Sequence, residues 1–157
     1  MSARIEAKGL VGLSRCFRDA VHSTRKEGRI LFVGTPFTCL PFAEFLCYGI
    51  RDLALKPFFM PGNQADKIRE IVKMEGYGYQ LGAHSKESHY DIVVLLGGLG
   101  MPKYGLPPAM LQEVLSSISD KENIIAVCFQ GTLKSIDWTG TFRFKFLINS
   151  DLMVTME

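Results

Sequence analysis

Four side chains of this sequence could take part in acid–base or nucleophilic chemistry: Cys39, Glu44, Lys103 and Tyr104. Cys39 lies at the predicted start of a helix, where a thiolate would be stabilised. Glu44 is the single acid of an apolar stretch, so burial would raise its pKa. No histidine lies close to Cys39 in the sequence, and the G-x-S-x-G motif of hydrolases is absent. A buried structural cysteine and an ion-paired glutamate are the commoner interpretations, and enzyme activity remains an alternative.

A loop with three glycines within four positions follows the clearest apolar run, "YDIVVLLGG". Gly97, Gly98 and Gly100 allow positive φ angles and let another group approach the backbone closely. That group could be a ligand, over which Lys103 and Tyr104 would lean, or a neighbouring part of the protein. The run differs from G-x-G-x-x-G because a lysine stands at the third glycine's position, which disfavours a typical dinucleotide site.

The segment "GTPFT" offers a second binding loop. Gly34 ends an apolar run, and Thr35 and Thr38 precede a predicted helix whose free N–H groups could hold an anion. The alternative is that Thr38 only caps the helix. Gln130 belongs to a further loop, "FQGTLKS", after another apolar run. None of these loops matches a flavin or other cofactor motif, so the cofactor is unknown.

A metal site is not expected. His84 and His89 flank Glu87, but they are five residues apart in a polar segment that is typical of a solvated loop. The four cysteines have no metal-ligand spacing and include no C-x-x-C, so we expect them to be small buried hydrophobic residues.

The elements that must position these loops alternate between helices and apolar strands. Helices are predicted over 10–26, 38–51, 63–75 and 107–119, and strands over 29–34, 54–62, 77–82, 90–98 and 123–131. At the end of the chain, Phe142, Phe144 and Phe146 alternate with Arg143 and Lys145. That alternation predicts an edge strand over 142–148, and "LMVTM" would return as its hairpin partner.

This order predicts one α/β domain over 1–157: a three-layer α/β/α sandwich, Rossmann-like or flavodoxin-like, with a mostly parallel sheet and a C-terminal antiparallel edge hairpin. Right-handed crossovers would bring four loops to one edge of the sheet, where ligands bind in such folds. These loops are 34–38, 60–63, 97–105 and 129–135, and each contains glycine.

Composition excludes several classes of protein. The chain has 157 residues, and its net charge of +2 comes from scattered basic residues, so no nucleic-acid partner is expected. No apolar stretch is long enough to span a membrane, and "MSARIEAKGL" lacks the apolar core of a signal peptide. We therefore expect a cytoplasmic protein.

Three stretches carry a resemblance: "FVGTPFTCLPFAEFL", "VLLGGLGMPK" and "VCFQG". Through them the chain resembles a group of small archaeal proteins, found mainly in methanogens and classed as a domain of unknown function. The resemblance implies a Rossmann-like cytoplasmic protein. It implies no activity and no catalytic residues.

The sequence thus leaves three hypotheses. The first is a domain that binds a small anionic or nucleotide-like ligand at the loop edge. The second is a homodimeric interaction module that uses the apolar helix 38–51 and the edge strand 142–148. The third is a cofactor-dependent transferase or oxidoreductase in the same pocket.

Overall fold

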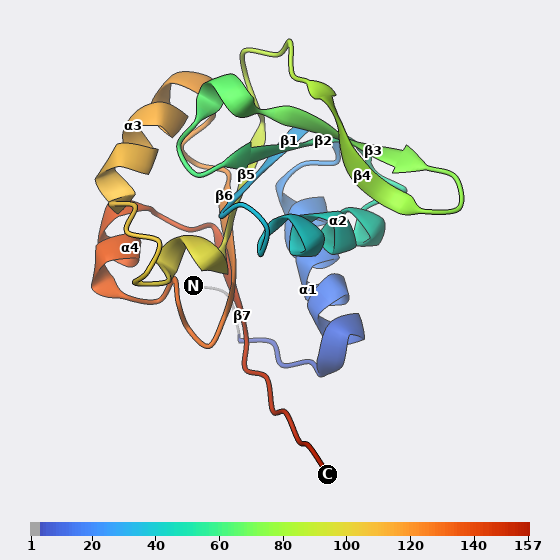
Figure 1. Ribbon diagram of the computed structural model, residues 1–157, viewed down its shortest axis with the longest axis vertical. Coiled ribbons are helices and arrows are strands. Elements are labelled where there is room, and N and C mark those ends of the chain that lie inside the picture. The colour runs from blue at the N-terminus through green and yellow to red at the C-terminus, as the bar shows by residue number, and fades with distance from the viewer. Residues whose placement is uncertain (1–3) are drawn as a thin grey trace.

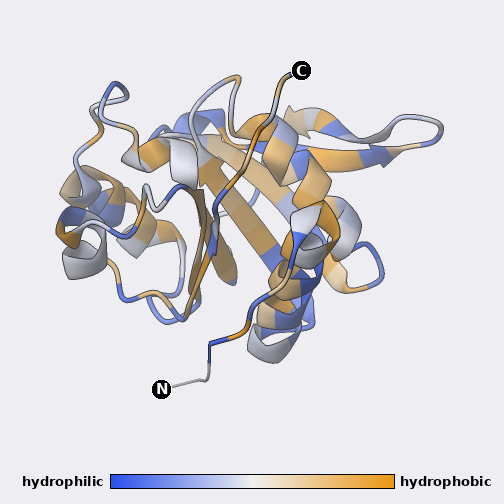
Figure 2. Ribbon diagram, turned by 90° about the horizontal axis from the view of Figure 1, so that it is seen from below, coloured by the Kyte–Doolittle hydropathy of each residue, from blue (hydrophilic) through white to orange (hydrophobic). Residues whose placement is uncertain are grey.

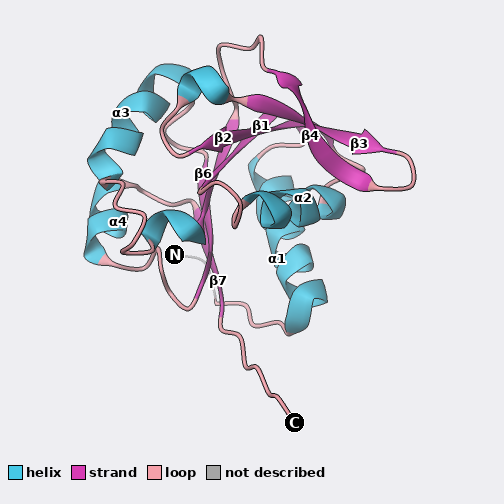
Figure 3. Ribbon diagram, in the orientation of Figure 1, coloured by secondary structure: helices cyan, strands magenta, loops and turns pink. Residues whose placement is uncertain are grey.

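The computed structural model describes residues 4–157 as three layers, a seven-stranded sheet between two pairs of helices (Figures 1 and 3). Helices α1 (Gly9–Thr24) and α2 (Leu40–Gly49) cover one face of the sheet, and α3 (Pro108–Ile118) and α4 (Ile136–Thr141) cover the other. The predicted α/β/α sandwich is confirmed. Residues 1–3, which begin the segment examined for a signal peptide, lie outside the described residues.

The sheet has the order β4-β3-β2-β1-β5-β6-β7. Its strands are β1 (Glu27–Gly34), β2 (Ala54–Pro61), β3 (Arg69–Met74), β4 (Gly78–His84), β5 (Ile92–Leu96), β6 (Ile124–Phe129) and β7 (Phe146–Ser150). Neighbours from β2 to β7 pair in parallel, whereas β3 and β4 are antiparallel. The five parallel strands, counted along the chain, have the order 2-1-3-4-5 of flavodoxin-like folds.

Apolar runs place the three central strands inside the molecule. All five residues of β5 are buried, as are Ile124–Cys128 of β6. Figure 2 shows these strands as an apolar layer between the helices. Strands covered on both faces need side chains of this kind at every position, which explains why the runs do not alternate.

The helix predicted over 63–75 is wrong. That segment forms a short 3-10 turn, Ala65–Lys67, followed by β3, which pairs with β2 and β4. A short apolar run fits both periodicities, and pairing with neighbouring strands decided the outcome. Gly76 in the turn and Gly78 at the start of β4 both adopt positive φ, at 83° and 82°, which lets the chain reverse between β3 and β4.

The expected antiparallel hairpin at the C-terminus is also wrong in position. β7 spans Phe146–Ser150 rather than 142–148 and pairs in parallel with β6, and no strand follows it. Phe142 caps α4 and is buried between the helices and the sheet, so the alternating segment turns inward before β7 begins. The antiparallel pair of the sheet lies at the opposite edge, in β3 and β4.

No helix among residues 4–157 is both long and apolar enough to cross a bilayer.

Candidate functional site

The candidate site lies where the sheet topology reverses. β1 stands between β2 and β5, and the chain leaves β1 toward α2 on one face but leaves β5 toward α3 on the other. The two connections diverge at the carboxyl ends of these strands. In open α/β sheets this divergence leaves a crevice in which ligands bind.

A cavity of about 320 Å³ occupies this position on the α1–α2 side of the sheet. Three of the four predicted loops line it through Thr38, Gly97, Gly98, Gln130 and Thr132. Its walls are apolar: Leu13, Phe42, Leu46, Leu96, Met101, Val127 and Phe129. Among residues 4–157, Cys39 alone completes the lining, so no charged side chain of this part of the chain faces the cavity.

Lys103 and Tyr104 do not lie over this cavity, and the loop 60–63 does not reach it. Lys103 is exposed, and Tyr104 is half-buried. The Tyr104 hydroxyl packs on Gly62, so closely that a Cβ atom at Gly62 would lie 2.3 Å from it. Tyr104 therefore joins the loops after β2 and β5 on the α3–α4 side of the sheet.

The three glycines after β5 serve packing within the protein. None of them uses the positive φ that glycine allows, whereas the close approach that it allows is present at all three. A Cβ at Gly97 would lie 2.8 Å from the Cys128 Cα, and one at Gly100 would lie 2.1 Å from the Thr132 carbonyl oxygen. The Thr132 hydroxyl also donates to the Gly97 carbonyl over 2.8 Å. The loops after β5 and β6 are thus held in direct backbone contact.

The loops after β1 and β5 are equally close. A Cβ at Gly98 would lie 2.5 Å from the Cys39 Sγ and 2.6 Å from the Thr35 Oγ1. Gly34 is buried behind Cys39, and its added Cβ would lie 2.3 Å from the Cys39 Cβ. These contacts fix the rear wall of the cavity and leave no freedom for bulkier residues at either glycine.

A hydrogen-bonded group of small side chains begins α2. Thr35 Oγ1 lies 2.6 Å from Thr38 Oγ1 and 3.2 Å from Cys39 Sγ. The expected cap by Thr38 is wrong, because Cys39 occupies the N-cap position and no side chain caps the helix. Pro41 removes one N–H group, and the Thr38 and Cys39 N–H groups donate to the Pro36 and Thr35 carbonyls. This helix start therefore has few donors left for an anion.

Two exposed residues beside the cavity have unusual backbone conformations. Phe37 has φ 69° and Gln130 has φ 53°, and these are the positive values among non-glycine residues of 4–157. Such conformations cost free energy and are concentrated at functional sites. Phe37 is 91% exposed, so no packing inside the chain accounts for its strain.

The expected titrating groups do not gather in the cavity. Glu44 does not line it, and burial raises the pKa of that carboxyl. Burial also raises the pKa of the Cys47 thiol, with a further contribution from the Glu44 charge. Of the four candidate groups, Cys39 alone lines the cavity, and the lining contributed by residues 4–157 includes no charged or histidine side chain.

The apolar lining was not identified from the sequence. Phe42 and Phe129 come from different elements, and their rings pack at 4.7 Å between centroids. The usable signal was the helix 38–51 itself, whose apolar residues continue nearly all round. Phe42, Leu46 and Cys39 use the face that such a helix presents to a second apolar surface.

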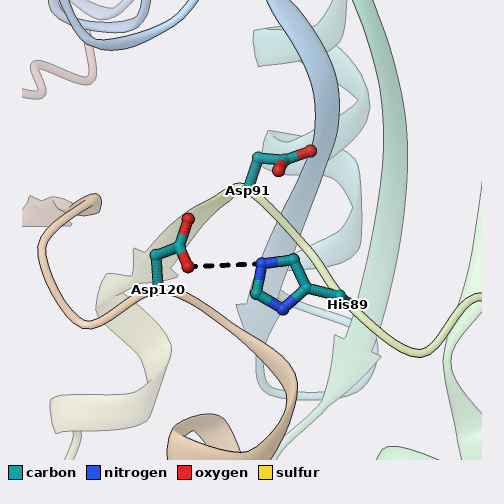
Figure 4. A group of neighbouring side chains, drawn as sticks. All are labelled: His89, Asp91 and Asp120. Atoms are coloured by element: carbon teal, nitrogen blue, oxygen red, sulfur yellow. Dashed lines mark ion pairs between the residues drawn. The ribbon is translucent and has the colours of Figure 1, made fainter.

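A group of potential metal ligands lies near the amino end of β5, away from the cavity (Figure 4). His89, Asp91 and Asp120 each offer one ligand atom within 4.8 Å of the others, and His89 Nε2 lies 3.3 Å from Asp120 Oδ1. Asp91 already accepts the Arg29 backbone N–H at 2.8 Å, and the Arg25 guanidinium lies 3.8 Å from its carboxylate. These partners compete with a cation, so the expectation of no metal site stays a prediction.

Comparisons with known proteins agree with this fold. An uncharacterized protein of Methanocaldococcus jannaschii is 32% identical over 151 residues, which cover 96% of this chain and 91% of that protein. An uncharacterized protein of Methanothermobacter thermautotrophicus is 29% identical over 148 residues, 94% of this chain and 92% of its own. A crystal structure of a protein of unknown function from M. thermautotrophicus superposes with a TM-score of 0.87 and 28% identity, over 100% of this chain and 97% of that one.

A family model described as an uncharacterized protein conserved in archaea matches residues 8–153. The match covers nearly the whole chain and confirms the resemblance that the three sequence stretches indicated. The chain belongs to this archaeal family, DUF2124.

Proposed function

We propose that the protein binds a small, largely apolar molecule in the cavity at the carboxyl ends of β1, β5 and β6. The observation that carries this proposal is a preformed cavity of about 320 Å³ at the topological switch point, with apolar walls and no charged side chain from the described residues, 4–157. Binding sites for small molecules are usually concave, mostly apolar and equipped with a few polar groups.

The expected anionic ligand does not suit this cavity. A buried anion needs a cation or several N–H donors. Lys103 does not line the cavity, and the start of α2 has lost donors to Pro41 and to backbone hydrogen bonds. We therefore replace the anionic ligand with a neutral one, such as a compact aromatic or aliphatic molecule.

Polar groups at the rim would orient such a ligand. Thr38, Gln130 and Thr132 line the cavity, but the Thr132 hydroxyl already donates to Gly97. The Gln130 side-chain oxygen accepts the Leu152 N–H, which leaves its NH₂ group without a partner among residues 4–157. The Thr38 hydroxyl and the Gln130 amide are thus the groups that would bind one polar atom of the ligand.

Native mass spectrometry of the freshly purified protein would identify a retained ligand. Independently, the fluorescence of Nile red, a neutral apolar dye, would report on the cavity. We expect Met101→Trp, which adds bulk at the cavity, to weaken dye binding about tenfold. Met110→Trp is the matched control, because both methionines are 49% exposed and Met110 lies on α3. Equal dye binding by wild type and both variants would contradict the proposal.

A second candidate function is self-association, and the C-terminal segment favours it. Residues 151–157 extend away from the domain after β7 (Figures 1 and 3). Met153, Val154 and Met156 are 96%, 87% and 96% exposed. The segment starts beside the cavity, because Gln130 holds Leu152 there. Since apolar side chains at this exposure gain free energy on burial, a second copy of the chain is the partner proposed.

This candidate differs from the predicted dimer in the surface used. The edge strand runs over Phe146–Ser150 rather than 142–148, and the proposed contact uses the exposed residues 152–156 together with Phe42 of the predicted helix 38–51, whose side chain also lines the cavity. We expect Met153→Asp/Val154→Asp to shift a dimer toward monomer in sedimentation velocity. Ile136→Asp, at a residue 82% exposed on α4, should not. A wild-type chain that stays monomeric at high concentration would exclude self-association.

Enzyme activity has no specific observation in its favour. Cys39 would need a base, and none lines the cavity. The cytoplasmic location remains a prediction from the sequence.

A further inference from the structure

A groove of about 640 Å³ opens at the amino ends of the parallel strands, whereas the apolar cavity lies at their carboxyl ends. It lies between the end of α3, the start of β6 and the segment 141–145. That segment contains the alternating aromatic and basic residues for which the sequence predicted a strand. Because no strand forms before Phe146, Arg143 and Lys145 line the groove rather than the outer face of a sheet edge.

The groove carries an excess of positive charge. Lys121, Arg143 and Lys145 line it, and Glu122 is the one acidic residue among its lining. None of these three cations forms an ion pair with a carboxylate of residues 4–157. Asp120, next in sequence to Lys121, faces His89 instead. Unpaired cations around a recess attract and concentrate anions there.

The carbonyl groups at the end of α3 do not need these cations as partners. The last carbonyls of a helix carry partial negative charge and would repel an anion. Two of the last four carbonyls already have partners: Leu115 accepts the Ser119 hydroxyl over 2.7 Å and the Ser119 N–H over 3.0 Å, and Ile118 accepts the Tyr90 N–H over 2.8 Å. Lys121 is therefore not required as the partner of these two carbonyls.

A column of aromatic rings forms part of the groove wall. Trp138 and Phe142 stack at 5.9 Å between centroids and 13° between planes, and Phe142 and Phe144 stack at 6.1 Å and 17°. Phe142 and Phe144 both line the groove, and Phe144 is only half-buried. A planar ring that stacks on Phe144 would lengthen this column.

We propose that this groove binds a phosphate ester that carries a planar ring, the class to which nucleoside monophosphates belong. Arg143 holds the phosphate through its paired N–H groups, which match phosphate oxygens in geometry. Lys121 and Lys145 add charge, and Phe144 stacks on the ring. The volume of about 640 Å³ falls within the range of small-molecule sites. This site is separate from the apolar cavity and does not depend on the function proposed for it.

The single tryptophan of the chain provides the readout. Adenosine monophosphate is the probe, and Trp138 is excited at the red edge of its absorption, where the nucleotide does not absorb. We expect a saturable change in Trp138 fluorescence and amide shifts at Ser116, Asn123 and Lys145 in the NMR spectrum. Binding should weaken as salt rises, because the attraction is between charges.

Charge-reversed variants test whether Arg143 and Lys145 bind the phosphate group. Arg143→Glu/Lys145→Glu should lose at least about tenfold in affinity for adenosine monophosphate. The matched control, Lys103→Glu/Lys134→Glu, changes the same net charge at exposed lysines of the carboxyl-edge loops and should stay near wild type. Circular dichroism confirms that both variants fold.

Two further probes separate the parts of the ligand. Adenosine and inorganic phosphate should each bind more weakly than adenosine monophosphate, since each lacks one of the two interactions. Adenosine that binds as tightly as the nucleotide would overturn the role of the cations. Absence of a saturable response, equal loss in both double variants, or amide shifts confined to Thr38 and Gln130 would overturn the site.

Discussion

The carboxyl ends of the parallel strands form one edge of the sheet and their amino ends form another, and the two edges carry recesses of opposite character. At the carboxyl edge, three loops lie in close contact around a cavity that no charged side chain of residues 4–157 lines. At the amino edge, the groove is lined by three cations without ion-pair partners in residues 4–157, beside an aromatic column. The comparison separates two kinds of recognition within one fold, one by apolar burial and one by charge.

The walls of the two recesses differ in rigidity as well as in charge. The carboxyl-edge loops contact each other so closely that a single added methyl group would clash with backbone at Gly100. The amino-edge groove depends on the exposed side chains of Arg143 and Lys145, which lie outside the strands, and only the Lys145 N–H of this pair bonds to the sheet, at the Ile124 carbonyl of β6 over 2.8 Å. A rigid wall selects a ligand by shape, whereas long cationic side chains select it by charge and tolerate several shapes.

The largest expected effect is a loss of stability when bulk is added to the closely packed loops of the carboxyl edge. Gly100→Ala places a Cβ 2.1 Å from the Thr132 carbonyl oxygen, so the loops after β5 and β6 must separate. We expect a loss of about 1–3 kcal/mol in the free energy of unfolding, the usual cost of overpacking. Urea denaturation measures it, and the Nile red response should fall as well because Thr132 lines the cavity.

Gly140→Ala is its control, since Gly140 lies in α4 with nothing within 4 Å of an added Cβ. Alanine there should be neutral or stabilise by about 0.5 kcal/mol. A stable Gly100→Ala protein would refute the close packing of the carboxyl-edge loops.

An intermediate effect is expected from Thr35→Val at the start of α2. Thr35 is 7% exposed, and its hydroxyl contacts both Thr38 and Cys39. Loss of this hydrogen-bonding group should lower the free energy of unfolding by about 1 kcal/mol. Thr139→Val removes a hydroxyl that bonds an exposed helix carbonyl, so its change in the denaturation midpoint should be much smaller. Equal losses would show that the threonine group does not support the cavity wall.

The smallest effect tests whether charge is excluded from the cavity. Burial raises the pKa of Glu44, so the folded state favours the protonated carboxyl. Stability from this group is complete at pH below its unfolded pKa and is lost as pH rises through its folded pKa. Glu44→Gln should therefore raise the melting temperature slightly at pH 8 and make little difference near pH 4.

Glu113→Gln, at an exposed position of α3, is the control. Thermal denaturation at both pH values provides the measurement. Glu44 does not line the cavity, so Nile red binding by Glu44→Gln should match wild type at either pH. A pH-dependent dye affinity that disappears in this variant would place the Glu44 charge at the cavity after all.

Much of the fold followed from local patterns. Unbroken apolar runs predicted the central strands, and the amphipathic segment at 10–26 predicted α1, which spans Gly9–Thr24. The prediction failed where a short segment suited two structures. Residues 69–74 fit a helix by spacing, and α4 was overlooked because it has only six residues.

By itself the sequence determined the layers of the fold and the edge at which its glycine-bearing loops meet, because apolar periodicity and chain order leave few ways to bury strands and connect them. Tertiary structure alone decided what those loops enclose. Gly98 lies against Thr35 and Cys39, Phe42 meets Phe129, and Lys103 does not line the cavity. The physical reason is distance along the chain: these contacts join residues whose proximity depends on strand order and packing, which no local pattern encodes.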